Sequence, residues 1–123
     1  MAGFDETFDW IVVGSGAGSL ASALVMRAAG KSVLVLEKTP FVGGTTAKSG
    51  GVIWVPNNRL MQQAGEVDSS EAGVTYLEAL CEDLPGSSPE KRAAYVTQAQ
   101  KMIDFLIAQG VKLERASDFW PDY

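Results

Sequence analysis

The sequence has no histidine among its 123 residues and only one cysteine, Cys81. Histidine is the most common general base and metal ligand in proteins, so its absence argues against a histidine-based active site, and we expect no metal site. A single cysteine cannot form a disulfide within the chain, which fits a reducing compartment and predicts a cytoplasmic location. Cys81 follows a helical pattern with Leu77 and Leu84, so we interpret it as a buried structural residue rather than a redox thiol.

Long apolar runs and an excess of basic residues are also missing. No stretch of about 18 apolar residues is present, so the sequence predicts no transmembrane helix. The first ten residues, MAGFDETFDW, are acidic and do not resemble a secretory signal. With a net charge of −5, the chain lacks the basic surface that nucleic acids require. Its content of 46% hydrophobic and 20% charged residues is ordinary for one globular domain.

The N-terminal third has the pattern of a strand–helix–strand unit. Residues 8–13 (FDWIVV) form an apolar run that leads directly into glycine, as a buried parallel strand does. Residues 19–29 have helical spacing, and Gly30 suits the position just after a helix, where a positive φ is needed. Residues 32–36 (SVLVL) predict the second strand. A crossover of this kind is expected to be right-handed.

The turn between the first strand and the helix has the features of a dinucleotide-binding motif. Gly14 permits a sharp turn, and Gly16 lets the backbone approach a pyrophosphate at the helix N-terminus. Glu37 ends the second strand, close to the spacing of about 20 residues expected for a carboxylate that binds a ribose. The alternative is a strand–turn–helix unit without a ligand. The predicted contacts here are Gly14, Ser15, Gly16, Ala17, Gly18, Ser19, Glu37 and Lys38.

A second cluster of glycine and hydroxyl residues, GGTTAKSGG, occupies residues 43–51. Its N–H groups and hydroxyls can bind pyrophosphate, and Gly50 and Gly51 allow the backbone to lie against a flat ring system. A flexible surface loop is the alternative, but residues 52–55 (VIWV), which predict a short strand, argue for packing. The predicted cofactor contacts in this segment are Gly43, Gly44, Thr45, Thr46, Ala47, Ser49, Gly50 and Gly51.

Helical patterns follow this segment. Asn57 or Asn58 is expected to cap a short helix that ends at Gly65. Asp68 and Glu71 predict a capping box at the start of the next helix. The apolar face of that helix is expected to comprise Val74, Leu77, Leu80, Cys81 and Leu84.

A long helix is predicted to begin at Ser88, with Pro89 at its favoured first position, and to end at Gly110. Residues 111–113 are expected to form a strand. The buried stripe of the long helix is predicted to comprise Tyr95, Ala99, Met102, Ile103 and Leu106.

Three motifs carry a family resemblance: GSGAGSLASAL, VLEK and GGTTAKSGGVIWVPNN. Together they resemble the FAD-binding half of the fumarate reductase/succinate dehydrogenase flavoprotein superfamily. Within it, SGGVIWVPNN and the final DFWPDY are most similar to the 3-ketosteroid Δ1-dehydrogenases. Members are several times longer, and their catalytic domain lies downstream. The resemblance therefore implies FAD as cofactor, a 3-ketosteroid as substrate and the remainder of the same enzyme as partner.

The predicted fold class is α/β, a Rossmann-type FAD-binding domain with a parallel sheet. A doubly wound sheet usually has about five or six strands, whereas only two central ones are visible here. We therefore expect the sheet to be incomplete in residues 1–123 and to be completed by residues absent from the chain. Within this N-terminal part, residues 8–37 form the dinucleotide unit, residues 39–58 the second FAD-contacting loop and strand, and residues 59–123 a mostly helical extension towards the substrate site.

The resemblance also implies a reaction. A tyrosinate removes a proton from C2 of the 3-ketosteroid while a hydride leaves C1 for flavin N5, and donors to the keto oxygen stabilise the developing charge. Tyr123 of the PDY motif is implied to line the active site and assist the base, with a packing role as the alternative. Relatives that tether flavin use a histidine near the second glycine cluster. Thr45 and Thr46 stand there in this chain, so FAD is expected to be bound non-covalently.

Two other functions stay open at this point. One is a flavin-dependent reductase of an unsaturated acid, similar to fumarate reductase. The other is a non-catalytic FAD-binding fragment or subunit. Trp54 is expected either to pack near the flavin or to fill the core.

Overall fold

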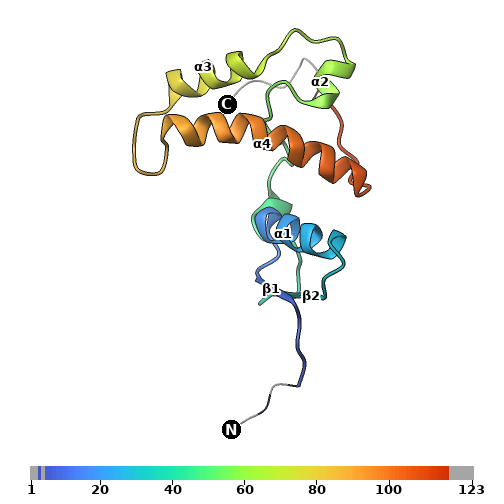
Figure 1. Cartoon of the computed structure of the whole chain (residues 1–123). Coiled ribbons are helices and arrows are strands. Elements are labelled where there is room, and N and C mark those ends of the chain that lie inside the picture. Colours follow the sequence, from blue (N-terminus) through green and yellow to red (C-terminus); the bar gives the residue numbers. More distant parts are fainter. Residues whose placement is uncertain (1–2, 4, 117–123) are drawn as a thin grey trace. The chain divides into compact units, whose positions relative to one another are not determined.

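The computed structural model describes residue 3 and residues 5–116, which divide into two compact units, Met1–Val52 and Ile53–Tyr123 (Figure 1). Helices and a parallel pair of strands occur together, which confirms the predicted α/β class. In the part of the chain that is described, no helix is both long enough and apolar enough to cross a membrane.

The first unit is built on two parallel strands, β1 (Trp10–Val13) and β2 (Val33–Leu36). Both consist of apolar residues, with valine in each, which suit a pleated, partly buried surface. The N–H group of Gly14 donates to the carbonyl of Leu36 at 2.7 Å, so the pairing continues into the glycine-rich turn. The register pairs Trp10 with Val33, Ile11 with Leu34, Val12 with Val35 and Val13 with Leu36.

Helix α1 (Ala17–Ala28) connects the two strands and packs against both (Figure 1). Ala23 on the helix and Val12 on β1 are buried, and the small alanine lets the helix lie close to the strands. Gly30 follows the helix with a φ of 78°, and its N–H group donates to the carbonyl of Arg27 at 3.0 Å. The predicted glycine at this helix end is confirmed.

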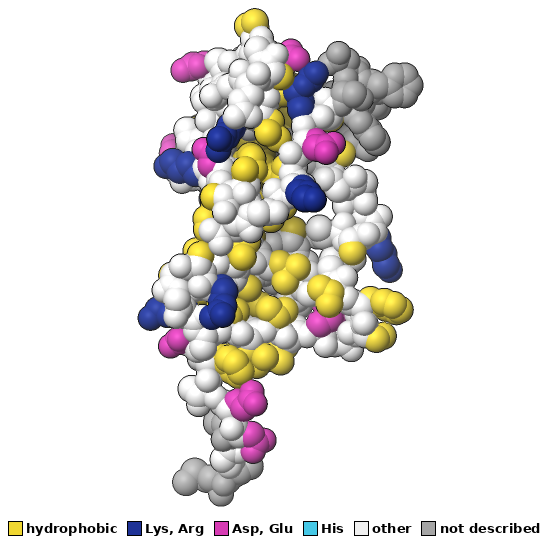
Figure 2. All heavy atoms as spheres, turned by 90° about the vertical axis from the view of Figure 1, so that its right-hand side faces the viewer, with side chains coloured by type: hydrophobic (Ala, Val, Ile, Leu, Met, Phe, Trp, Pro, Cys, Tyr) yellow, Lys and Arg dark blue, Asp and Glu magenta, His cyan; other side chains and the backbone are white. Residues whose placement is uncertain are grey.

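Much of the apolar surface of the first unit is exposed. Figure 2 shows hydrophobic side chains gathered over this unit, in the lower half of the picture. Apolar strand surfaces with free edges are normally covered by further structure. The exposed strand residues are Trp10, Ile11, Val13, Val35 and Leu36.

The second unit is helical. Helices α2 (Arg59–Gln63) and α3 (Ser70–Leu80) both pack against the long helix α4 (Pro89–Ala108) (Figure 1). The core of this unit lies along one side of α4. It consists of Val55, Ala99 and Ile103, with Met102, Ile107 and Leu113 packed against them.

Several predicted helix ends are confirmed. Asn58 caps α2, because its Oδ1 accepts hydrogen bonds from two N–H groups of the first turn at 2.9 and 3.2 Å. Gly65 follows α2 with a φ of 74°. Ser88 caps α4 ahead of Pro89, and Gly110 follows that helix with a φ of 88°.

The cap of α3 differs from the prediction by one residue. Ser69 is the N-cap, and its Oγ accepts a hydrogen bond from the N–H group of Ala72 at 3.0 Å. Asp68, predicted to pair with Glu71 in a capping box, instead accepts from the N–H groups of Asn57 and Ser69 at 2.5 and 2.8 Å. Asn57 has a φ of 50°, and the carboxylate satisfies the backbone N–H of this tight turn.

Two predicted strands are wrong. Residues 52–55 and 111–113 form no strand, because no described segment pairs with them. One side chain from each segment contributes to the second unit instead. Val55 belongs to its core, and Leu113 packs against that core.

The buried face of α4 is rotated relative to the prediction. Val96 has no exposed surface, whereas Tyr95, predicted to be buried, is 44% exposed. Ala99 and Ile103 are buried as expected. Arg92 lies on this buried face too. A pattern of apolar residues does not predict the burial of a charged side chain.

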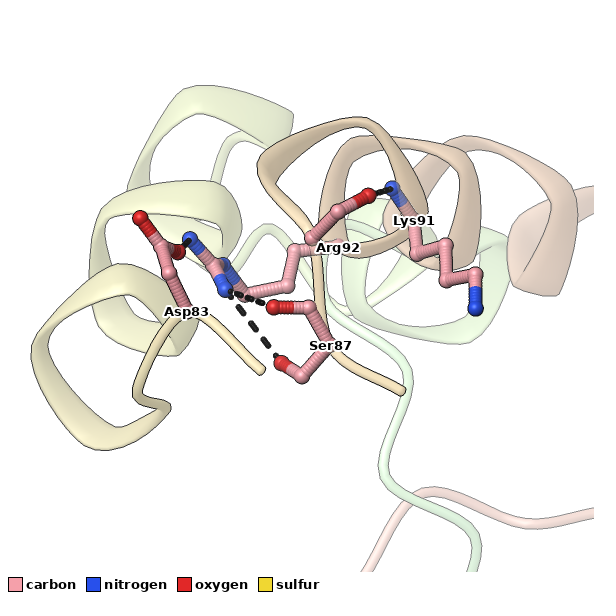
Figure 3. Close-up of polar contacts among 5 residues, drawn as sticks. Asp83, Ser87, Lys91 and Arg92 are labelled. Carbon is pink, nitrogen blue, oxygen red and sulfur yellow. Dashed lines mark hydrogen bonds and ion pairs between the residues drawn. The ribbon is translucent and has the colours of Figure 1, made fainter. Parts of the chain in front are cut away.

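Arg92 is buried and fastens the connection between α3 and α4 (Figure 3). Its Nη1 donates to the carbonyl and the Oγ of Ser87 at 2.7 and 3.2 Å, and its Nη2 donates to Asp83 at 2.6 Å. Hydrogen bonds to a buried guanidinium are costly to remove, because the charge is then left unpaired. Helix α3 ends at Leu80, before the predicted Leu84, and Cys81 is its half-buried C-cap.

Gly73 on α3 provides a test of this packing. A Cβ atom there would lie 2.5 Å from Cγ of Pro56. We expect Gly73→Ala to lower the free energy of unfolding, because an overpacking cost of about 1–3 kcal/mol exceeds the gain of up to about 1 kcal/mol in helix propensity. Thermal denaturation measures this. Gly86→Ala is the control, since no atom lies within 4 Å of its added Cβ, and equal melting temperatures for both variants would contradict the close approach.

Candidate functional site

The turn between β1 and α1 has the backbone geometry expected of an anion-binding loop. Gly14 has a φ of 91°, a conformation that other residues rarely adopt. Gly16 is the N-cap of α1. A Cβ at Gly16 would lie 3.8 Å from Oγ1 of Thr46, in van der Waals contact, so Gly16 faces the second glycine cluster.

The N-terminus of α1 presents unpaired donors. Among the described residues, the N–H groups of Gly18 and Ser19 have no hydrogen-bond acceptor, and the first turn contains no acidic side chain. Free N–H groups and the helix dipole favour an anion at this end. The N–H groups of Gly18 and Ser19 can therefore bind a phosphate group without losing an existing hydrogen bond.

Ser15 links the ends of the two strands to the second glycine cluster. Its side chain is 1% exposed. Both its N–H group and its hydroxyl donate to Oε2 of Glu37, at 3.1 and 2.5 Å. The same hydroxyl oxygen accepts a hydrogen bond from the N–H group of Gly43 at 2.8 Å. Three segments predicted to contact the cofactor thus meet at one buried hydroxyl.

The other oxygen of Glu37 faces Thr39, a residue that the sequence analysis did not single out. The N–H group and Oγ1 of Thr39 lie 3.1 and 3.2 Å from Oε1 of Glu37. A Thr two positions after a strand-ending Glu is the sequence signal that would have identified it, because short hydroxyl side chains often bond to nearby backbone and carboxylate groups.

These donors keep Glu37 ionised. The Ser15 hydroxyl, followed by the N–H group of Thr39, lowers the pKa of the Glu37 carboxyl from 4.5 to about 2. At neutral pH the carboxylate therefore accepts hydrogen bonds and donates none. Its negative charge would also repel a phosphate on an adjacent ribose.

The second glycine cluster folds back towards α1. Oγ1 of Thr46 accepts a hydrogen bond from the N–H group of Ala17 at 3.1 Å, so Thr46 caps α1 from a distance in sequence. Thr46 begins a short 3₁₀ helix, η1 (Thr46–Lys48). Gly43 has a φ of 107°, and a Cβ there would lie 2.6 Å from Cβ of Ala47, so only glycine fits this turn.

The other predicted contacts divide into two groups. Ser49 stabilises the loop, since its Oγ donates to the carbonyl of Thr46 at 2.8 Å. Gly51 has a φ of 73°, which the loop needs to turn. The remaining predicted residues, Lys38, Gly44, Thr45 and Gly50, are exposed.

The second unit contains a shallow groove that sequence analysis did not predict. Trp54 stacks on Tyr95 with ring centroids 6.1 Å apart and lies 5.4 Å from Tyr76. The Tyr95 hydroxyl donates to the carbonyl of Trp54 at 2.5 Å. The groove has a volume of about 410 Å³. It is lined by Trp54, Leu77, Gly86, Ser87, Lys91, Arg92 and Tyr95.

The predicted catalytic residue Tyr123 and the neighbouring aromatic residues 119 and 120 lie outside the described residues. Within residues 3 and 5–116, no three His, Cys, Asp or Glu side chains are arranged to hold a metal ion.

Comparison with known proteins identifies the family to which this site belongs. The FAD binding domain family matches residues 9–119. The chain belongs to this family. Its cofactor is therefore FAD, which agrees with the glycine turn before α1, the free N–H groups of α1 and the carboxylate of Glu37.

Three relatives show how far the similarity extends. The chain is 40% identical over 102 residues to a 3-oxosteroid 1-dehydrogenase of Mycobacterium tuberculosis, covering 83% of this chain and 18% of that protein. It is 49% identical over 118 residues to a 4-oxocyclohex-2-ene-1-carboxylate 5-dehydrogenase of Sinomonas cyclohexanicum, covering 93% and 19%. The crystal structure of a 3-ketosteroid Δ1-dehydrogenase from Sterolibacterium denitrificans with 1,4-androstadiene-3,17-dione superimposes with a TM-score of 0.73 and 42% identity, covering 82% and 17%. The chain thus spans about a fifth of the length of its relatives.

The Ser15 contact can be tested through the pKa of Glu37. We expect Ser15→Ala to raise this pKa from about 2 towards 4.5, because the largest cause of its depression is the serine hydroxyl. Since the folded-state pKa is depressed, the stabilisation is present above pH 4.5 and is lost as the pH falls towards about 2. Carbon-13 NMR titration of the carboxyl group measures the shift. Ser22→Ala, whose hydroxyl contacts Trp10 instead, should leave the pKa unchanged, and an unchanged value in Ser15→Ala would rule out the contact.

Proposed function

We propose that the first unit binds the ADP half of FAD. The observation that carries this proposal is the convergence of both glycine clusters and Glu37 on the N-terminus of α1, through Ser15 and Thr46. The N–H groups of Gly18 and Ser19 hold the pyrophosphate, where the helix dipole favours negative charge. Glu37 accepts hydrogen bonds from the adenosine ribose.

The second glycine cluster forms the other wall of this site. Gly44 and Thr45 are exposed residues beside the turn that Gly43 makes, and in this proposal the N–H group of Gly44 and the hydroxyl of Thr45 bind the pyrophosphate. Lys38, Ala47 and Ser49 border the same site, and Gly50 and Gly51 let the backbone lie against the flavin ring.

FAD is held without a covalent bond. The chain contains no histidine, and Cys81 lies at the C-cap of α3, in the unit that does not contain the glycine clusters. Acid precipitation of the holoprotein should release all of its flavin into the supernatant, and flavin retained by the precipitate would contradict this proposal.

We further propose that the whole protein is an FAD-dependent oxidoreductase that dehydrogenates a 3-ketosteroid at C1 and C2. FAD, when bound, supplies the acceptor for the hydride. The support comes from relatives whose names specify this reaction at about 40% identity. In this proposal Tyr123 places its hydroxyl beside a tyrosine base of the remaining protein. A donated hydrogen bond favours the tyrosinate and lowers its pKa, which is near 10 in a free tyrosine.

A second candidate substrate is a smaller cyclic ketone that carries a carboxylate. The relative from Sinomonas cyclohexanicum, named for a 4-oxocyclohexene carboxylate, is 49% identical to the chain, against 40% for the mycobacterial 3-oxosteroid dehydrogenase. Both names describe dehydrogenation of a ring that bears a ketone. The two candidates therefore share the reaction class and differ in the ring system of the substrate.

The ribose assignment is tested by Glu37→Ala. This change removes a charged acceptor, an interaction of about 1.5–3 kcal/mol, so the affinity for FAD should fall by about 10- to 100-fold while the fold is retained. Fluorescence titration of the flavin-free protein measures the dissociation constant. Glu78→Ala, an exposed position on α3, is the matched control. Equal affinities for wild type and Glu37→Ala would mean that the ribose is bound elsewhere.

The reaction is tested by turnover on both substrates. We expect the whole protein to dehydrogenate a 3-ketosteroid faster than 4-oxocyclohex-2-ene-1-carboxylate, and the reverse order would favour the second candidate. Tyr123→Phe should lower turnover by about 100-fold or more, because the hydroxyl that assists the base is lost, with flavin content unchanged. Wild-type turnover in this variant would leave Tyr123 as a packing residue.

A further inference from the structure

The two carboxylate oxygens of Glu37 have different surroundings. Oε2 is bound by the N–H group and the hydroxyl of Ser15, whose side chain is buried. Oε1 faces the exposed residue Thr39. An ionised carboxylate has about four acceptor positions, two on each oxygen. The two donors from Ser15 occupy both positions of Oε2, so any ligand must bind at Oε1.

The position left open on Oε1 depends on the Thr39 hydroxyl. This hydroxyl has one proton and two possible acceptors, the carbonyl of Phe41 at 2.8 Å and Oε1 of Glu37 at 3.2 Å. The shorter distance assigns the proton to Phe41, since hydrogen bonds from hydroxyl groups are strongest near 2.7–2.8 Å. The N–H group of Thr39 is then the one donor to Oε1 among the described residues, and one acceptor position stays free.

We propose that Thr39 is a positioning residue for the cofactor, which holds Glu37 so that the free position of Oε1 receives a hydroxyl of the adenosine ribose. The inference rests on the proposed role of Glu37 in ribose binding. The N–H group of Thr39 orients the carboxylate. Its hydroxyl closes the turn over residues 39–41, through the bond to the Phe41 carbonyl and a contact of 3.4 Å from the Phe41 N–H group.

The alternative assignment of the proton has the opposite consequence. If the Thr39 hydroxyl donated to Oε1, all four acceptor positions of Glu37 would be occupied, and the ribose would have to displace Thr39. Removal of the hydroxyl would then strengthen FAD binding. The sign of the change in affinity therefore distinguishes the two arrangements.

The test uses the whole protein, freed of flavin and reconstituted with FAD. We expect Thr39→Val to weaken FAD binding by about three- to tenfold, the range for one neutral hydrogen bond, and Thr39→Ser to bind as wild type does because it retains the hydroxyl. Thr97→Val is the matched control, since its hydroxyl bonds only within α4. Thr39→Ala replaces the valine variant if valine at this position prevents folding.

Two further measurements separate positioning from a general effect on the loop. An FAD analogue that lacks both hydroxyls of the adenosine ribose should bind equally well to wild type and Thr39→Val. In a double-mutant cycle, Thr39→Val should have no effect in the Glu37→Ala background, because Thr39 acts through Glu37. A loss that is the same for the analogue, or that persists without Glu37, would overturn the proposal.

The failure of this inference is distinguishable from failure of the ribose assignment. If Glu37→Ala leaves FAD binding unchanged, the assignment of the ribose to Glu37 is wrong. If Glu37→Ala weakens binding but Thr39→Val leaves it unchanged or strengthens it, the ribose assignment stands and Thr39 does not position the carboxylate.

Discussion

The hydrogen bonds between Ser15 and Glu37 are the contact on which the cofactor site depends. They join the turn after β1 to the end of β2, and through the Ser15 hydroxyl they also hold Gly43. Two adjacent parallel strands end at the same edge of a sheet, which places the turn and the carboxylate side by side. The buried hydroxyl then determines which way Glu37 turns and where the second glycine cluster begins.

This arrangement also resolves an electrostatic conflict. A carboxylate close to a pyrophosphate is unfavourable unless its charge is offset, and here the N–H group and hydroxyl of Ser15 and the N–H group of Thr39 donate to it. The first turn of α1 contains no acidic residue, so the favourable end of the helix dipole is left to the ligand. Glu37 and the helix N-terminus thus serve different parts of the cofactor, the ribose and the pyrophosphate.

The second unit depends on packing rather than on a polar site. Gly73 lets α3 approach Pro56 closely, and Val96 and Ile103 of α4 are buried. The carbonyl of Trp54 is held by Tyr95, and Arg92 fastens the connection between α3 and α4.

The sequence by itself determined the strand–turn–helix–strand unit, the helix ends at Gly30, Gly65 and Gly110, and the family. These features are local, since they depend on runs of apolar residues and on glycine at positions of positive φ. Only the tertiary structure decided that Val55 is buried in a segment without a strand partner, that Val96 rather than Tyr95 is buried, and that Thr39 contacts Glu37. Apolar residues predict burial, but the partner that buries them comes from elsewhere in the chain. The choice between strand and packed segment, and between one helix face and the next, is therefore made by contacts that no local pattern contains.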